Sequence, residues 1–241
     1  MKLTVDGIAA VGFVALAMSC HAGGASLIAV DVGHSSLRPG AISARGIPEF
    51  EYNLALSRTI HDTLSSRHVS SVLIGDDGTM TNLQARTATA SARGASFFLS
   101  VHHDSAQSKY LETWTWEGRE RRHTERFSGF SLFVSRKNPD ASSSLECARR
   151  IGFALKNAGF KPTAHHAEPI PGENREWADA DSGVYFFDDL VVLRTARTPA
   201  LLLEAGVILN RDEETAIQKP ATRKAIATAV VQGLIDCRAI S

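Results

Sequence analysis

Four side chains in this sequence have the chemistry that metal-dependent hydrolysis needs. His34 follows the apolar run "IAVDVG", His102 lies near the end of "SFFLSVHH", and Glu204 lies near the end of "PALLLEAG". Glu49 begins a stretch with helical periodicity. Two histidines and one carboxylate, with a fourth position left for water, are a usual ligand set of catalytic Zn²⁺. A second carboxylate close to such a metal can serve as the general base.

The residues alone leave two choices open within this set. His102 and His103 would face opposite sides of a strand, so only one of them is expected to reach a metal. Glu49 and Glu51 both lie near the start of the helix. Any one of these residues taken alone is more often structural, and the shared placement at element ends is what favours a metal site.

The elements that would position these residues alternate along the chain. Apolar or alternating runs predict strands at 26–34, 70–75, 96–103, 129–135, 189–194 and 198–206. Apolar residues spaced four apart, together with residues typical of helix starts and ends, predict helices at 49–67, 82–94 and 143–159. They also predict a last helix that begins at Pro220. This alternation predicts an α/β domain with helices on both faces of one sheet. Ligand sites in such sheets lie beyond the carboxyl ends of the strands.

Finer features of three elements can also be predicted. Ser143 and Glu146 fit a capping box, and Gly159 is placed to end the same helix. The alternation in 129–135 predicts a strand with one solvated face. The continuous apolar run in 198–206 predicts a central strand.

Two long segments, 105–128 and 161–188, are polar and irregular, with aromatic residues interspersed. We expect them to be surface excursions, since loops of this length in a compact domain are usually functional or disordered. Packing onto the domain is the expected role of their tryptophans, and stacking on sugar rings is the alternative. The polar stretch "HHAEPIPGENR" (165–175) could line a substrate groove.

The overall composition suits one globular domain. The chain has 241 residues, of which 44% are hydrophobic and 22% are charged. Because 26 basic and 26 acidic side chains cancel, no net field favours nucleic acid or an anionic membrane as a partner. We therefore expect no nucleic-acid partner, and we expect a monomer.

The N-terminus has the features of an export signal. A basic start precedes the apolar run "IAAVGFVALAM", which is too short to span a bilayer. We predict a signal peptide over 1–22, with cleavage near Ala22, and a catalytic domain over 23–241. The alternatives are a lipoprotein signal that ends before a lipidated Cys20, and a buried N-terminal element. Export would place the protein in the periplasm or cell envelope, where Cys147 and Cys237 could pair, although two buried thiols fit equally well.

Four ordered motifs carry a resemblance to a known family. "VDVGHSSLRPGA", "EFEYNLAL", "LSVHHDS" and "LVVLRTARTPALLLEAGVILNRDEE" resemble the motifs of the zinc-dependent N-acetylmuramoyl-L-alanine amidases of bacteria, the amidase 3 group, over about residues 27–215. The match selects Glu49, four residues before Asn53, and it selects His102. "NLQAR" also fits, with Arg86 in a structural role.

The resemblance implies a mixed central β-sheet flanked by helices on both faces. It implies one Zn²⁺ per chain held by His34, Glu49 and His102, with Glu204 as the catalytic general base. The implied substrate is peptidoglycan, whose muramyl peptides would be cut between N-acetylmuramic acid and L-alanine.

Some members of that family carry an inhibitory helical insertion after the strand equivalent to 129–135. Here the chain leads almost directly into the next predicted helix, so an open site is expected. Two rival interpretations are a zinc peptidase that cuts peptide amides and a catalytically silent wall-binding module.

Overall fold

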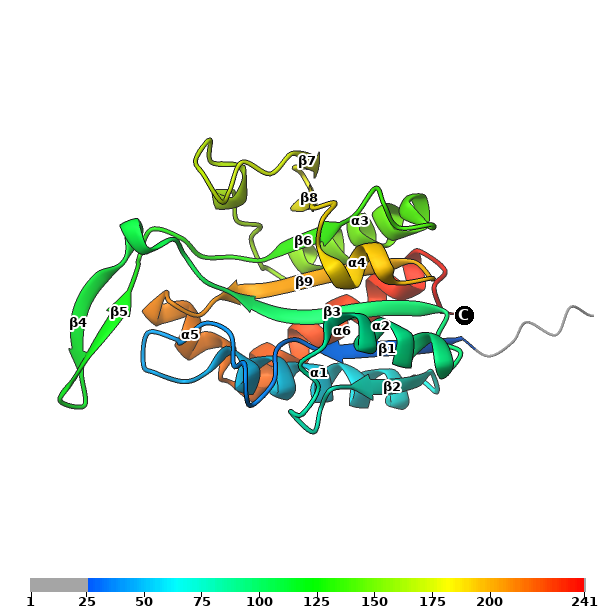
Figure 1. Ribbon diagram of the computed structural model, residues 1–241, viewed down its shortest axis with the longest axis horizontal. Coiled ribbons are helices and arrows are strands. Elements are labelled where there is room, and N and C mark those ends of the chain that lie inside the picture. Colours follow the sequence, from blue (N-terminus) through cyan, green and yellow to red (C-terminus); the bar gives the residue numbers. More distant parts are fainter. Residues whose placement is uncertain (1–25, 241) are drawn as a thin grey trace, which may run out of the picture.

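A seven-stranded mixed sheet forms the centre of the computed structural model, which describes residues 26–240 (Figure 1). Its strands, in spatial order, are β2 (Ser70–Ile74), β1 (Leu27–Val32), β3 (Phe97–Asp104), β9 (Ala200–Val207), β6 (Ser131–Val134), β8 (Val184–Phe186) and β7 (Trp177–Asp179). The first four are parallel, whereas β6 runs antiparallel to β9. The predicted α/β class with a mixed sheet is confirmed. The predicted signal segment 1–22, with Cys20, lies outside the described residues.

Helices cover both faces of this sheet, as predicted. One face packs against α1 (Glu49–Ser66), α3 (Ala141–Asn157) and α6 (Pro220–Asp236), and the other against α2 (Leu83–Ala92) and α4 (Val191–Thr195). The short α5 (Arg211–Ile217) follows β9. The four-residue spacing of Leu56, Ile60 and Leu64 places all three in the larger core, with no exposed surface. Burial of this apolar stripe is what holds α1 on the sheet.

The two strands at the middle of the sheet differ in how well the sequence predicted them. β9 is central, between β3 and β6, and it is almost entirely buried. The solvated face predicted for 129–135 is wrong, because all four residues of β6 are buried. Phe133, on the side expected to be wet, stacks on Tyr185 of β8.

The strand predicted at 189–194 is wrong, since α4 occupies that position. A short apolar run carries no clear period, so strand and helix cannot be told apart from it. A tertiary contact decides the outcome. The buried Asn138 amide donates hydrogen bonds to the carbonyl oxygens of Leu193, Ala196 and Thr198, and so ties down the C-terminal end of α4.

The capping box predicted at Ser143 is also wrong. α3 begins after Asp140, and no side chain caps it. The nearby Ser144 hydroxyl donates to the Asp140 carbonyl oxygen and accepts from the Ala200 amide, so it serves tertiary packing. Gly159 does follow the helix in the left-handed region, with φ 93°, as its predicted end role requires.

The two long segments contain more structure than predicted. Segment 105–128 forms a hairpin of β4 (Glu112–Trp116) and β5 (Arg119–His123), which projects from one end of the molecule (Figure 1). Its two-residue turn, Glu117-Gly118, has positive φ at both positions, which suits a twisted hairpin. Segment 161–188 supplies β7 and β8, so the prediction that it only runs over the surface is wrong.

Cys147 of α3 and Cys237 at the end of α6 form a disulfide. This excludes the alternative of two buried thiols.

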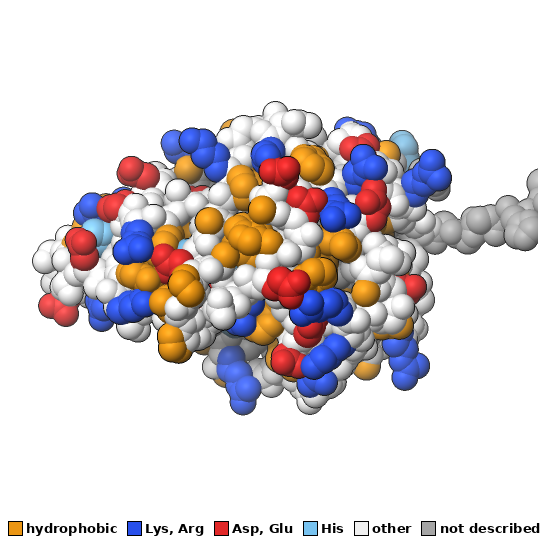
Figure 2. Space-filling model, turned by 90° about the horizontal axis from the view of Figure 1, so that it is seen from above, with side chains coloured by type: hydrophobic (Ala, Val, Ile, Leu, Met, Phe, Trp, Pro, Cys, Tyr) orange, Lys and Arg blue, Asp and Glu red, His pale blue; other side chains and the backbone are white. Residues whose placement is uncertain are grey.

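Within residues 26–240, no helix is both long and apolar enough to cross a membrane. Basic and acidic side chains are interspersed on the face shown in Figure 2, as the balanced composition suggests.

Candidate metal centre and active site

The structure brings His34, Glu49 and His102 together at the carboxyl ends of the parallel strands. His34 Nε2 lies 3.0 Å from Glu49 Oε2, and His102 Nδ1 lies 3.1 Å from Glu49 Oε1. One ligand atom from each of the three residues lies within 4.8 Å of the other two. These are donor types that Zn²⁺ binds, so the residues fit a metal ion.

Two glycines make room for this arrangement. A Cβ atom on Gly33 would overlap the His102 ring, and one on Gly40 would overlap the Glu49 carboxylate. His34 itself has φ 65°, a left-handed conformation that turns the chain sharply after β1. Gly33 is therefore required because the His102 ring lies directly against it. This position brings the ring centroids of His34 and His102 to within 4.9 Å of each other.

Glu49 is held in place from several sides. Pro48 precedes it at the start of α1, and the Asn53 amide one turn later donates to its Oε1 at 3.1 Å. The Ala41 amide donates to Oε2. Burial alone would raise the pKa of Glu49, but hydrogen bonds and charge from His102 and His34 hold that pKa well below its usual range. The carboxylate is therefore ionised, as a metal ligand must be.

The structure places the two members of each pair that the sequence left open in different surroundings. Glu51 is exposed, whereas Glu49 is buried. His103 lies on the other side of β3, where its Nδ1 bonds the Asn53 side-chain oxygen at 2.8 Å. Burial lowers the pKa of His103 to about 3, so its ring is neutral. Of the two histidines, His102 is the one whose ring contacts Glu49 and His34.

Glu204 lies directly opposite His102 in the register of β3 and β9. Its Oε2 atom is shielded from solvent and has no hydrogen-bond partner among the described residues. Burial, followed by the negative charges of Asp104 and Glu49, raises the pKa of Glu204 well above its usual range. A cation bound nearby would oppose that effect and favour the ionised form.

Two cavities meet at His102. One, of about 290 Å³, is lined by His34, Arg38 and Met80, and the other, of about 240 Å³, by Glu204, His166 and Arg175. Both also touch Leu190 and Leu202. His102 of the candidate metal centre therefore lies between two recesses.

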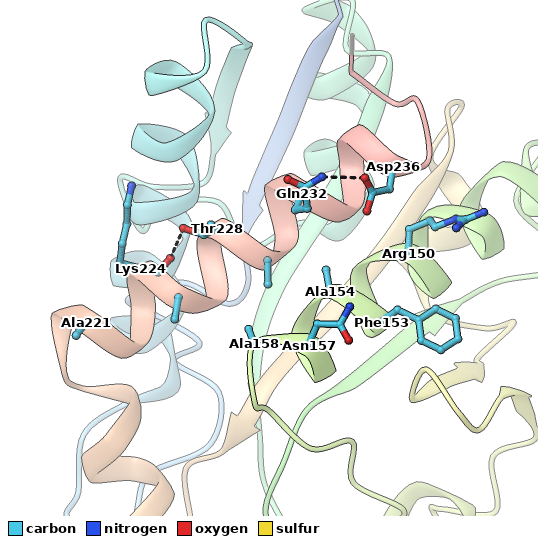
Figure 3. A pocket seen from close by; sticks show the side chains of 12 residues that line it. Arg150, Phe153, Ala154, Asn157, Ala158, Ala221, Lys224, Thr228, Gln232 and Asp236 are labelled. Carbon is cyan, nitrogen blue, oxygen red and sulfur yellow. Dashed lines mark hydrogen bonds between the residues drawn. The ribbon is translucent and has the colours of Figure 1, made fainter.

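A larger hollow, of about 810 Å³, lies elsewhere, between α3 and α6 (Figure 3). Small and polar side chains line it, with Phe153 and Arg150 at its edge. It contains no group of potential metal ligands, since the two groups found among residues 26–240 are both formed elsewhere. Its size alone does not make it a catalytic site.

Sequence reasoning missed the second of those groups, formed by Asp104, His165 and His166. The only signal was the pair of adjacent histidines in "HHAEPIPGENR", a stretch for which groove lining was one of the possible roles. His166 does line the cavity that Glu204 enters, so that expectation is consistent with the structure.

A single α/β domain with three potential metal ligands, and a carboxylate on the neighbouring strand, has the construction of a metal-dependent hydrolase. The family model for N-acetylmuramoyl-L-alanine amidase, Amidase_3, matches residues 28–236. The chain therefore belongs to the amidase 3 family of N-acetylmuramoyl-L-alanine amidases, enzymes that act on peptidoglycan.

Individual relatives agree with this assignment. The chain is 26% identical to the N-acetylmuramoyl-L-alanine amidase AmiA of Escherichia coli K12, over 89% of this chain and 76% of AmiA. Its fold is similar to that of the amidase from Clostridium difficile 630, with a TM-score of 0.68, 20% identity and coverage of 88% and 96% of the two chains. Ami1 of Mycobacterium smegmatis gives a TM-score of 0.69 at 18% identity, over 88% and 96% of the chains.

Proposed function

We propose that this amidase cuts the amide between the lactyl group of N-acetylmuramic acid and the L-alanine of the stem peptide, with His34, Glu49 and His102 holding one Zn²⁺ and Glu204 acting as general base. The observation that carries the proposal is the position of Glu204. Its Oε2 atom is shielded from solvent and has no hydrogen-bond partner among the described residues, and the residue lies across the strand pair from His102.

Each residue then has a defined task. Bound Zn²⁺ would polarise the lactyl carbonyl and lower the pKa of a coordinated water. Glu204 accepts a proton from the attacking water and returns one to the departing alanine nitrogen, so that the amine leaves in neutral form. Asn53 holds the Glu49 carboxylate, and Gly33 leaves space for the His102 ring.

The two cavities suit the two halves of such a substrate. A muramyl peptide carries a sugar on one side of the reacting amide and a peptide on the other. Arg38 lines one cavity and Arg175 lines the other. Guanidinium groups pair well with carboxylates, so either arginine could bind the carboxylates of a stem peptide.

Export is part of the proposal. A signal peptide over 1–22, or a lipid anchor on Cys20, would place residues 23–241 in the periplasm or cell envelope as a monomer. The Cys147–Cys237 disulfide supports this location, because such bonds persist in oxidising compartments.

Digestion of purified sacculi tests the reaction. We expect the mature protein to release stem peptides with new free L-alanine amino ends, identified by mass spectrometry, and we expect Glu204→Gln to release almost none. Cleavage within the stem peptides would instead establish a peptidase. Zinc binding with no release of peptides at all would establish a wall-binding module.

A further inference from the structure

The second group of potential ligands lies where β3 ends. Asp104 is the last residue of β3, and His165 and His166 reach it from a 3₁₀ turn, His165–Ala167, in the segment before β7. His166 Nε2 lies 2.7 Å from Asp104 Oδ2, and His165 Nε2 lies 3.2 Å from the same oxygen atom. All three residues are buried. Two imidazole nitrogens thus converge on one carboxylate, as they do at Glu49.

The other nitrogen of each ring also has an oxygen partner. His166 Nδ1 lies 2.9 Å from Glu173 Oε2, and His165 Nδ1 lies 2.9 Å from Thr163 Oγ1. Metal-binding histidines usually bond a carboxylate or another oxygen through the nitrogen that does not bind the metal. That bond fixes the ring so that its free nitrogen faces the ion. Both rings here have that arrangement, with their Nε2 atoms turned toward Asp104.

A simple ion pair accounts for only part of this cluster. Asp104 and His166 satisfy each other. The buried His165 Nε2 lies 3.2 Å from Asp104 Oδ2 but forms no hydrogen bond with any described residue, and its side chain is only 3% exposed. The two rings are packed with their centroids 4.0 Å apart. Buried polar atoms without partners are uncommon in folded proteins, and a bound ion is one explanation for such an atom. A cation between Asp104 and the two Nε2 atoms would supply a partner to all three.

We propose that Asp104, His165 and His166 bind a second divalent transition-metal ion, separate from the one assigned to His34, Glu49 and His102. A set of two imidazoles and one carboxylate suits Zn²⁺ and its neighbours such as Co²⁺. The ion would tie the segment that carries His165 and His166 to the end of β3. It would also neutralise Asp104, whose charge acts on the nearby Glu204. This site requires no assumption about the substrate.

Metal counting tests the proposal. The purified mature protein is stripped with a chelator, reloaded with Zn²⁺, dialysed and analysed for metal. We expect about two ions per chain in the wild type, about one in His34→Ala, about one in His166→Ala, and almost none in the combined variant. His61→Gln is the matched control, because His61 belongs to neither group and, among the described residues, its side chain bonds only Ser71. It should keep the wild-type content.

A second measurement separates this site from the proposed function. In His34→Ala, bound Co²⁺ should give a visible absorption spectrum that disappears when Asp104→Asn is added. Asp104→Asn keeps the shape of the side chain, so it tests the site even if His166→Ala fails to fold. One ion per wild-type chain with none in His34→Ala would overturn the second site and leave the catalytic assignment intact. Two ions in Asp104→Asn would overturn it as well.

Discussion

Glu49 and Glu204 have opposite surroundings, and the roles proposed for them rest on this difference. Glu49 touches two imidazoles and three amide donors, whereas Glu204 Oε2 has no hydrogen-bond partner among the described residues. We expect Glu204→Gln to lower kcat by about 10²–10⁴, because the amide cannot accept a proton. Its zinc content should not change. Glu49→Gln should lose one zinc ion together with activity, as a ligand would.

Turnover and metal content of both variants decide between these roles. The exposed Glu51 provides the control, since Glu51→Gln keeps the helix start but changes no contact at the metal centre. It should match the wild type in both measurements. If Glu204→Gln loses zinc while Glu49→Gln keeps it, the two roles are exchanged.

At the scale of elements, the β4–β5 hairpin packs on the loop that contains Ala44 and Arg45. Trp114 stacks on Trp116, donates its indole N–H to the Ala44 carbonyl oxygen and lies under the guanidinium of Arg211. Arg45 covers both indole rings. These contacts occupy the faces of Trp114, so packing accounts for the two tryptophans of the hairpin.

We therefore predict that the hairpin is not a lid. A variant in which 112–123 is replaced by a short Gly-Ser link should digest sacculi no faster than the wild type. The mature wild-type protein should itself be active without a partner, since α3 begins soon after β6, with no long helical insertion between them. The assay is dye release from labelled sacculi. An increase of about tenfold in the shortened variant would show that the hairpin restricts access.

At the scale of the whole molecule, the disulfide joins two helices far apart in sequence. It links α3 to the end of α6 across a separation of 90 residues, on the sheet face opposite α2 and α4. A cross-link of that span restricts the unfolded chain strongly. We predict that changing both Cys147 and Cys237 to Ser lowers the free energy of unfolding by about 2–4 kcal/mol.

Urea denaturation measures this loss, and the reduced wild type should show a similar one. Zinc content and amidase turnover should stay near wild-type values, because neither cysteine contacts the metal centre. Equal stability of the oxidised wild type and the double variant would contradict the prediction. Loss of zinc in the double variant would show that the two helices position the site.

Much of the metal centre could be predicted because its signals are local. His34 and Glu204 occur at the ends of apolar runs, and Glu49 and Asn53 are one helical turn apart. Strand ends meet at one edge of a parallel sheet, so these positions imply proximity without a model of the packing. Local patterns also predicted parts of the fold: the four-residue apolar spacing predicted helices α1 and α6, and the alternation of strands and helices predicted the class of the fold.

Other features depended on contacts that no local pattern encodes. The run 189–194 is apolar enough for a strand, whereas in the structure α4 packs in the smaller core and the distant Asn138 side chain bonds its C-terminal end. β7 and β8 are three residues each, too short to show a period, and they form because β6 offers a free edge.

The sequence by itself determined the fold class, the family and the candidate ligands of the first metal site, because periodicity and motif spacing are properties of neighbouring residues. Only the tertiary structure decided the grouping of Asp104 with His165 and His166, which are about sixty residues further along the chain. That grouping depends on the pairing of β6 with β9 and β8, which returns the segment before β7 to the end of β3. Long-range pairing of this kind is a property of the packed sheet, and a histidine pair in a polar segment does not reveal it.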